Sequence, residues 1–126
     1  MSGRVVRDRT ALPLAVFAVC AGVYVATLGP RAVGISDNAH FVHLAESLLH
    51  GRLDLLADKP PGDNDWAKYE GRWYVTFPPF PAVVIAPLVA LLGTAVWDRL
   101  FWAIVAGAAP ALLYVLLRAL RERNST

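Results

Sequence analysis

The polar part of this chain opens with SDNAHFVHLAESLLHG (residues 36–51) and closes with GRWYVTFPPFP (residues 71–81). Residues 36–81 hold all three histidines and seven of the ten acidic residues, and apolar runs lie on both sides. A simple membrane anchor has no need of such a segment. The pattern indicates polar chemistry at a membrane surface, where water and a substrate can reach it.

The apolar runs have the length of membrane-spanning helices. The composition is 56% hydrophobic with a mean hydropathy of +0.46, which is high for a soluble domain. Ala11–Leu28 and Leu100–Leu117 are each 18 residues without a charge. As helices they would be about 27 Å long, close to the roughly 30 Å of a bilayer core. The first run is longer than the hydrophobic region of a signal peptide, so we expect it to be retained.

A third apolar run, Phe80–Val96, is interrupted by two prolines and a glycine. The sequence therefore predicts an all-α membrane protein with two or three transmembrane helices. The extracytoplasmic loop between them would hold an amphipathic juxtamembrane helix and a small β-hairpin.

Charge predicts the orientation. Three arginines precede the first apolar run and three follow the last, whereas residues 30–78 have five Lys/Arg against seven Asp/Glu. The positive-inside rule places both arginine clusters in the cytoplasm and the loop outside, which requires an even number of crossings. Residues 80–96 would then form a re-entrant or juxtamembrane helix. The alternative is three full spans, with the C-terminus outside.

The predicted organisation follows from these assignments. It consists of a cytoplasmic N-terminus (1–10), a transmembrane helix (11–29), an extracytoplasmic loop (30–79), a re-entrant, juxtamembrane or transmembrane helix (80–96), a second transmembrane helix (97–117) and a basic tail (118–126). The net charge of +2 comes from the arginines at the membrane flanks, and nothing indicates a nucleic-acid partner. The lone Cys20 excludes an intrachain disulfide.

The loop begins with a predicted helix over Asp37–His50, with Ser36 as its N-cap and Gly51 as its stop. One apolar stripe recurs at helical spacing, and the helix is expected on the outer membrane surface; the stripe consists of Phe41, Leu44, Ala45 and Leu48. His43, Glu46 and His50 lie one turn apart on the other face. Their spacing matches no zinc motif, so solvated interfacial side chains are the favoured interpretation over a metal site.

A hairpin is predicted farther along, with its turn at Glu70-Gly71 between residues 66–69 and 72–75. Its aromatic side chains have two interpretations, as anchors at the lipid headgroups or as platforms that stack on a sugar. Asp37 also has two interpretations. It either stabilises the start of a helix electrostatically or acts as a general base facing a wet cavity.

In its order of parts the chain resembles the N-terminal end of the C-type membrane glycosyltransferases, which include protein O-mannosyltransferases and lipid A aminoarabinose transferases. The resemblance covers roughly residues 12–120. Its carriers are Ser36-Asp37 after the first span, LAESLLHGRL (residues 44–53), GRWYVTFPPFPA (residues 71–82), and Asp98-Arg99-Leu100 before a span that ends in LLRAL (residues 116–120).

This resemblance implies transfer of a sugar from a polyprenyl-phosphate donor to an acceptor outside the membrane, with Asp37 as the catalytic base. Substrate-binding residues are expected in the same loop, namely Asn38, His40, Asp65, Trp66, Tyr69 and Arg72. The expected location is a bacterial inner or plasma membrane.

Two departures from the family matter. Asn38 follows Asp37 where family members often have a second acidic residue. The one candidate cofactor is a divalent metal ion, and this departure removes the second carboxylate that would bind it. Family members also have more spans, which build the donor-lipid cavity. We therefore expect a fragment that is inactive alone and works with further membrane segments or subunits. The alternatives are a non-catalytic membrane subunit that binds a partner or a lipid headgroup, and a truncated remnant.

Overall fold

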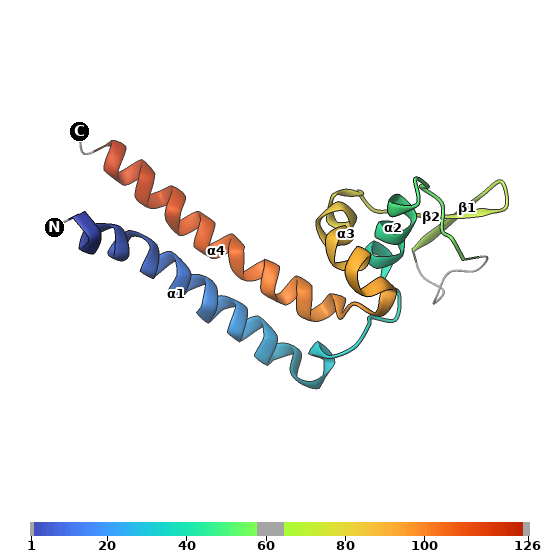
Figure 1. Cartoon of the computed structure of the whole chain (residues 1–126), viewed down its shortest axis with the longest axis horizontal. Helices are drawn as coiled ribbons and strands as arrows, with labels where there is room; N and C mark the ends of the chain where they lie inside the picture. The colour runs from blue at the N-terminus through green and yellow to red at the C-terminus, as the bar shows by residue number, and fades with distance from the viewer. Residues whose placement is uncertain (1, 58–64, 125–126) are drawn as a thin grey trace. The chain divides into compact units, whose positions relative to one another are not determined.

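The computed structural model describes residues 2–57 and 65–124, and side chains from residue 10 onward. Its described residues form the helices α1 (Ser2–Leu28), α2 (His40–Leu49), α3 (Phe80–Leu92) and α4 (Asp98–Arg123), the strands β1 (Trp66–Tyr69) and β2 (Arg72–Val75), and two short 3-10 turns, η1 (Gly29–Ala32) and η2 (Gly93–Ala95). The chain divides into two compact units, residues 1–32 with 99–126, and residues 33–98 (Figure 1).

The first unit pairs α1 with α4, and both chain termini lie at the same end of this pair (Figure 1). Both helices continue beyond the uncharged runs, because arginine is a good helix former. Asp98 lies in the first turn of α4, and two arginines lie in its last turn, as the helix dipole favours. Within the described residues, α1 with η1 (Thr10–Ala32) and α4 are the two helices long and apolar enough to cross a membrane.

Small residues form the contact between α1 and α4. Ala103, Gly107 and Ala111 are buried at four-residue spacing along a helix whose other side chains are mostly exposed. A Cβ built on Gly107 would lie 2.7 Å from the Cβ of Ala21 and 2.9 Å from its backbone nitrogen. This close approach of backbones is typical of helix pairs in membranes, where small residues replace a hydrophobic driving force.

The second unit is built around α2 packed on α3. Its buried apolar side chains come from both helices and from the segments beside them, namely Ala39, Val42, Leu44, Ala45, Leu55, Ala82, Ile85, Val89 and Val96. The third apolar run forms α3 and η2 (Phe80–Ala95), which together are shorter than the two candidate membrane spans. The two-span and the three-span topology both stay predictions.

The predicted start of α2 is wrong. The helix begins at His40, not at Asp37, and Ala39 is its N-cap residue. Ser36 instead accepts a hydrogen bond from the Ala39 backbone N–H at 3.1 Å, while its own N–H donates to the carboxylate of Asp98 at 2.8 Å. A contact 62 residues away along the chain therefore displaces the local capping pattern.

The predicted end of α2 is confirmed. Gly51 has a φ of 71°, its N–H donates to the carbonyl of Leu48 at 3.0 Å, and the Arg52 N–H donates to that of Ser47 at 2.9 Å. These two bonds form a Schellman motif, which needs a left-handed residue at the position of Gly51. The apolar stripe is partly confirmed, because Leu44 and Ala45 are buried whereas Phe41 and Leu48 are half-buried, and Val42, outside the predicted stripe, is buried as well.

The predicted hairpin is confirmed with its turn. Strands β1 and β2 pair antiparallel, with Trp66 opposite Val75 and Tyr69 opposite Arg72. Glu70 and Gly71 have φ values of 48° and 79°, the combination that a type I′ turn requires. Asp54 bridges Tyr74 on the other edge of β2, and the Leu55 N–H donates to the carbonyl of Trp73 at 2.8 Å. The hairpin is thereby joined to the segment that follows α2.

Candidate functional site

Asp37 is exposed in a bend just before α2, and not in the first turn of that helix. Asp37 lies two residues before the N-cap Ala39, still close to the N-terminus of the helix, so both interpretations of this carboxylate stay predictions. Its neighbour Asn38 is half-exposed in the same bend. An exposed carboxylate outside a helix can accept a proton from a bound hydroxyl group.

Asp98 fixes the bend that carries Asp37 through hydrogen bonds to Ser36. This carboxylate is only 7% exposed, accepts the backbone N–H of Ser36 at 2.8 Å, and also accepts the hydroxyl proton of Ser36. The same hydroxyl oxygen accepts the N–H of Ala39. Three hydrogen bonds therefore fix the position of Ser36, and they restrict the backbone of the adjoining Asp37.

A cluster of rings joins the start of α2 to the hairpin. We define this aromatic cluster as His40, Phe41, His43, Trp66 and Phe77. The ring centroid of His40 lies 4.4 Å from that of Trp66 and 5.2 Å from that of Phe77, the latter in edge-to-face geometry. Phe41 lies 6.0 Å from Phe77, and His43 lies 6.3 Å from Trp66. Offset and edge-to-face contacts of this kind contribute about 0.5–1.5 kcal/mol beyond the area they bury.

His43 is the titratable group most affected by this environment. Desolvation of its half-buried ring lowers its pKa below the ordinary value, and the nearby His40 acts in the same direction. Glu46, whose Oε2 lies 4.0 Å from Nδ1 of His43, and Asp98 oppose this change. Burial is the largest effect, so His43 favours its neutral form.

A buried carboxylate lies at the base of the hairpin. Asp54 is 5% exposed and accepts two hydrogen bonds from Arg52, from Nε at 3.2 Å and from Nη2 at 2.5 Å. Nη1 of Arg72 lies 3.7 Å from the same carboxylate. The hydrogen bonds from Arg52 hold the pKa of Asp54 below its usual range. Arg52 and Arg72 thus both interact with Asp54, and this joins residues 52–54 to β2.

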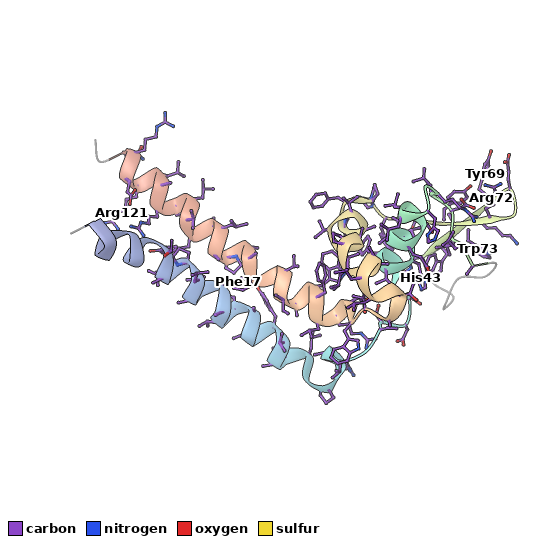
Figure 2. The ribbon with its side chains drawn as sticks, in the orientation of Figure 1. Phe17, His43, Tyr69, Arg72, Trp73 and Arg121 are labelled. Carbon is purple, nitrogen blue, oxygen red and sulfur yellow. The ribbon has the colours of Figure 1, made fainter. Side chains whose placement is uncertain are left out.

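The structure brings four of the six predicted substrate-binding residues together as two pairs, and one pair is His40 and Trp66, which stack in the aromatic cluster. Arg72 lies beside Asp54, and Tyr69, 65% exposed, is paired with Arg72 near the hairpin turn (Figure 2). Asp65 is exposed with a φ of 65°, and its backbone carbonyl accepts the hydroxyl proton of Thr76 at 3.0 Å.

Among the described residues, no group of three or more His, Cys, Asp or Glu side chains is placed to hold a metal ion. His50, which the sequence spaces one turn from Glu46, is exposed, and its Nδ1 lies 2.9 Å from the backbone carbonyl of Glu46. Sequence reasoning missed Asp54, Asp98 and Phe77 as structural partners of the site. Only Arg52-x-Asp54 offered a local signal, because side chains two residues apart in an extended segment point to the same side.

Comparison with known proteins gives no family assignment. No protein-family model matches the chain, and neither a curated protein nor a solved structure matches it significantly.

Proposed function

We propose that this chain supplies the first two spans and the first outer loop of a membrane glycosyltransferase, with Asp37 as its catalytic base. The observation that carries the proposal is the order of parts around Asp37. An apolar helix of membrane length precedes an exposed carboxylate, and a helix–hairpin–helix unit follows it before the second such helix. This is the order that the resemblance to C-type glycosyltransferases implies.

In the proposed reaction the acceptor hydroxyl group gives its proton to Asp37 as its oxygen attacks the anomeric carbon of the donor sugar. The bond from that carbon to the phosphate oxygen breaks, and polyprenyl phosphate leaves with the electron pair. The configuration at the anomeric carbon is inverted. No step needs an oxidant.

The chain's own residues have separate roles in this proposal. Ser36 and Asp98 position the bend that carries Asp37, through the hydrogen bonds described above. His40 and Trp66, whose rings contact each other, offer an aromatic surface on which a sugar can stack. Asn38, Asp65, Tyr69 and Arg72 complete the proposed substrate-binding surface, and further membrane segments or subunits supply the donor-lipid cavity.

The test of the base is transfer of sugar from radiolabelled polyprenyl-phosphate donors by membranes of source cells whose gene carries Asp37→Asn. General-base catalysis contributes about 10²–10⁴-fold, so transfer should fall at least a hundredfold. Glu70→Gln, which removes an exposed acid at the hairpin turn, is the matched control and should leave transfer unchanged. Full activity of Asp37→Asn would exclude Asp37 as the base. Retained transfer by the purified chain alone would show that no further segment is needed.

Membrane placement is tested separately. In a Cys20→Ser background, single cysteines replace Glu70 at the hairpin turn, Asn124 near the C-terminus and Leu91 on α3, whose side chain is 81% exposed. In intact cells an impermeant thiol reagent should label Cys at position 70 only. Position 124 should be protected by the cytoplasm and position 91 by lipid. Labelling at 124 would require an odd number of crossings, and labelling at 91 would place α3 in water.

The protection expected at position 91 follows from the surface of α3. Residues 76–97 contain no charged side chain, and the face of α3 turned away from α2 exposes Phe80 (73%), Val83 (57%) and Leu91 (81%). A helix that is apolar all round is normally buried in protein or lipid. The five residues 93–97 separate α3 from α4, and we propose that lipid at the bilayer surface covers the apolar face of α3.

A further inference from the structure

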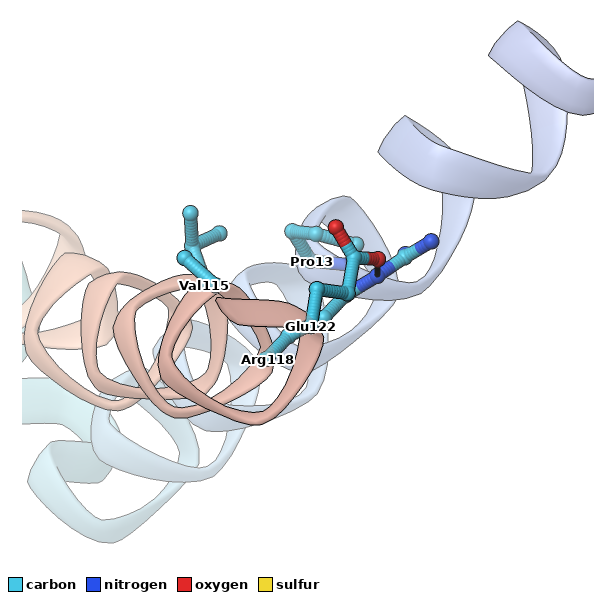
Figure 3. A pocket seen from close by; sticks show the side chains of 5 residues that line it. Pro13, Val115, Arg118 and Glu122 are labelled. Carbon is cyan, nitrogen blue, oxygen red and sulfur yellow. Dashed lines mark hydrogen bonds and ion pairs between the residues drawn. The ribbon is translucent and has the colours of Figure 1, made fainter. Parts of the chain in front are cut away.

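A cavity of about 170 Å³ lies between α1 and α4 near the charged ends of both helices (Figure 3). Its lining residues are Pro13 of α1 and Val115, Arg118, Ala119 and Glu122 of α4. A water molecule in the liquid occupies about 30 Å³, so the space is large enough for a phosphate ester with its neighbouring methylene groups. Three of the five side chains are apolar, and the other two carry opposite charges.

The two charged groups form a fixed pair. Nε of Arg118 donates to Oε1 of Glu122 at 3.1 Å, one helical turn away (Figure 3). This bond uses one of the five N–H donors of the guanidinium group, whose planar geometry suits a phosphate that binds through two oxygens. Arg118 is about one-third exposed, so it reaches solvent while its stem borders the cavity.

The position of the cavity along the helices indicates its occupant. Arg118 is the first charged residue after the uncharged run of α4, and Pro13 lies two residues inside the uncharged run of α1. If these runs span the bilayer, the cavity lies where lipid headgroups meet acyl chains. Arg118 is accompanied by Arg121 and Arg123 on the same helix end, so the local charge favours an anionic headgroup.

We propose that this cavity binds the phosphate of an anionic phospholipid, with Arg118 as the phosphate ligand and Pro13, Val115 and Ala119 against the first carbons of the lipid. Glu122 orients the guanidinium group. The proposal rests on the membrane placement of α1 and α4, but not on sugar transfer or on Asp37. A free phosphate would gain nothing from the apolar lining, whereas a lipid buries its methylene groups there.

The experiment is native mass spectrometry of the full chain in detergent with an equimolar mixture of phosphatidylglycerol and phosphatidylcholine that have the same acyl chains. The wild-type chain should retain phosphatidylglycerol at least fivefold over phosphatidylcholine, and Arg118→Gln should reduce this preference below twofold. Arg121→Gln removes the same charge without touching the lining and is the matched control, which should keep most of the preference. If both variants lowered the preference equally, general charge attraction would explain it, and the proposal would be overturned.

Two further variants test whether lipid binds inside the cavity or whether Arg118 and Glu122 form only a structural ion pair. Ala119→Leu fills the cavity without changing charge and should lower lipid retention several-fold. Glu122→Gln keeps an oxygen that can accept the bond from Arg118 but removes the negative charge, so the preference should stay intact or rise. Full retention by Ala119→Leu would contradict a cavity-bound lipid. Displacement of the lipid by millimolar inorganic phosphate would assign the site to free anions instead. Circular dichroism verifies that each variant keeps its helices, and alkaline extraction of membranes tests separately whether the chain is inserted.

Discussion

The hydroxyl group of Ser47 is the one buried side-chain polar atom without a hydrogen-bond partner in the described part of the chain. Ser47 is fully buried, so its hydroxyl has lost water and gained no replacement. An unsatisfied buried group costs about 1–3 kcal/mol. Ser47→Ala should therefore raise the free energy of unfolding by about that amount, seen as a higher melting temperature by circular dichroism in detergent.

The control for this prediction keeps the hydroxyl and adds volume. Ser47→Thr should lower the melting temperature, because an extra methyl group in a packed core costs about 1–3 kcal/mol. A loss of stability in Ser47→Ala would mean that the hydroxyl has a partner, such as a buried water molecule.

His43 predicts a pH dependence of stability. Since burial lowers its pKa in the folded chain, the unfolded chain binds the proton more readily at mildly acidic pH. The stabilising effect is therefore complete above the ordinary histidine pKa of about 6.5 and is lost as pH falls through the lower folded value. Glu46, His40 and Asp98 face the same ring and modulate this change.

The expected result is a melting temperature that falls between pH 7.5 and pH 5, with a smaller fall in His43→Gln. His50→Gln changes an exposed histidine at the end of α2 and should keep the wild-type slope. Identical slopes in all three proteins would remove His43 from the acid response.

At the scale of elements, the turn of the hairpin gives the sharpest prediction. A Cβ on Gly71 would meet no atom within 4 Å, so the cost of Gly71→Ala comes from the backbone alone, whose φ is 79°. That cost is about 1–2 kcal/mol, which should speed hydrogen exchange across residues 66–75. Glu70→Asn should slow exchange there, because Asn-Gly is preferred in type I′ turns. Faster exchange in both variants would contradict the assigned turn.

The elements also show what the sequence could and could not predict. The stop at Gly51 and the turn at Glu70-Gly71 depend on the backbone conformation of single residues, and both were predicted correctly. The start of α2 depends on Asp98, far along the chain, and no local pattern contains that partner. The same holds for the stacking of His40 on Trp66 and for the arginines around Asp54. The predicted site residues were therefore named from residue type, without their partners.

At the scale of the whole molecule, the pairing of α1 with α4 depends on Gly107. Its neighbours in the contact are the backbone and Cβ of Ala21, both within 3.0 Å of an added Cβ, so neither can yield by rotating a side chain. Gly107→Ala must therefore move one helix against the other, at a cost of about 1–3 kcal/mol.

Gly22, next to Ala21 in α1, is the matched control because a Cβ there would meet nothing within 4 Å. Gly22→Ala should stabilise the chain by about 0.5–1 kcal/mol through helix propensity alone. The same substitution in two adjoining helices is thus expected to have opposite signs, a lower melting temperature in detergent for Gly107→Ala and a higher one for Gly22→Ala. If both variants melt above the wild type, α1 and α4 do not touch at this point. Ala103, Gly107 and Ala111 would then be available to another helix, such as one of the further membrane segments of the proposed enzyme.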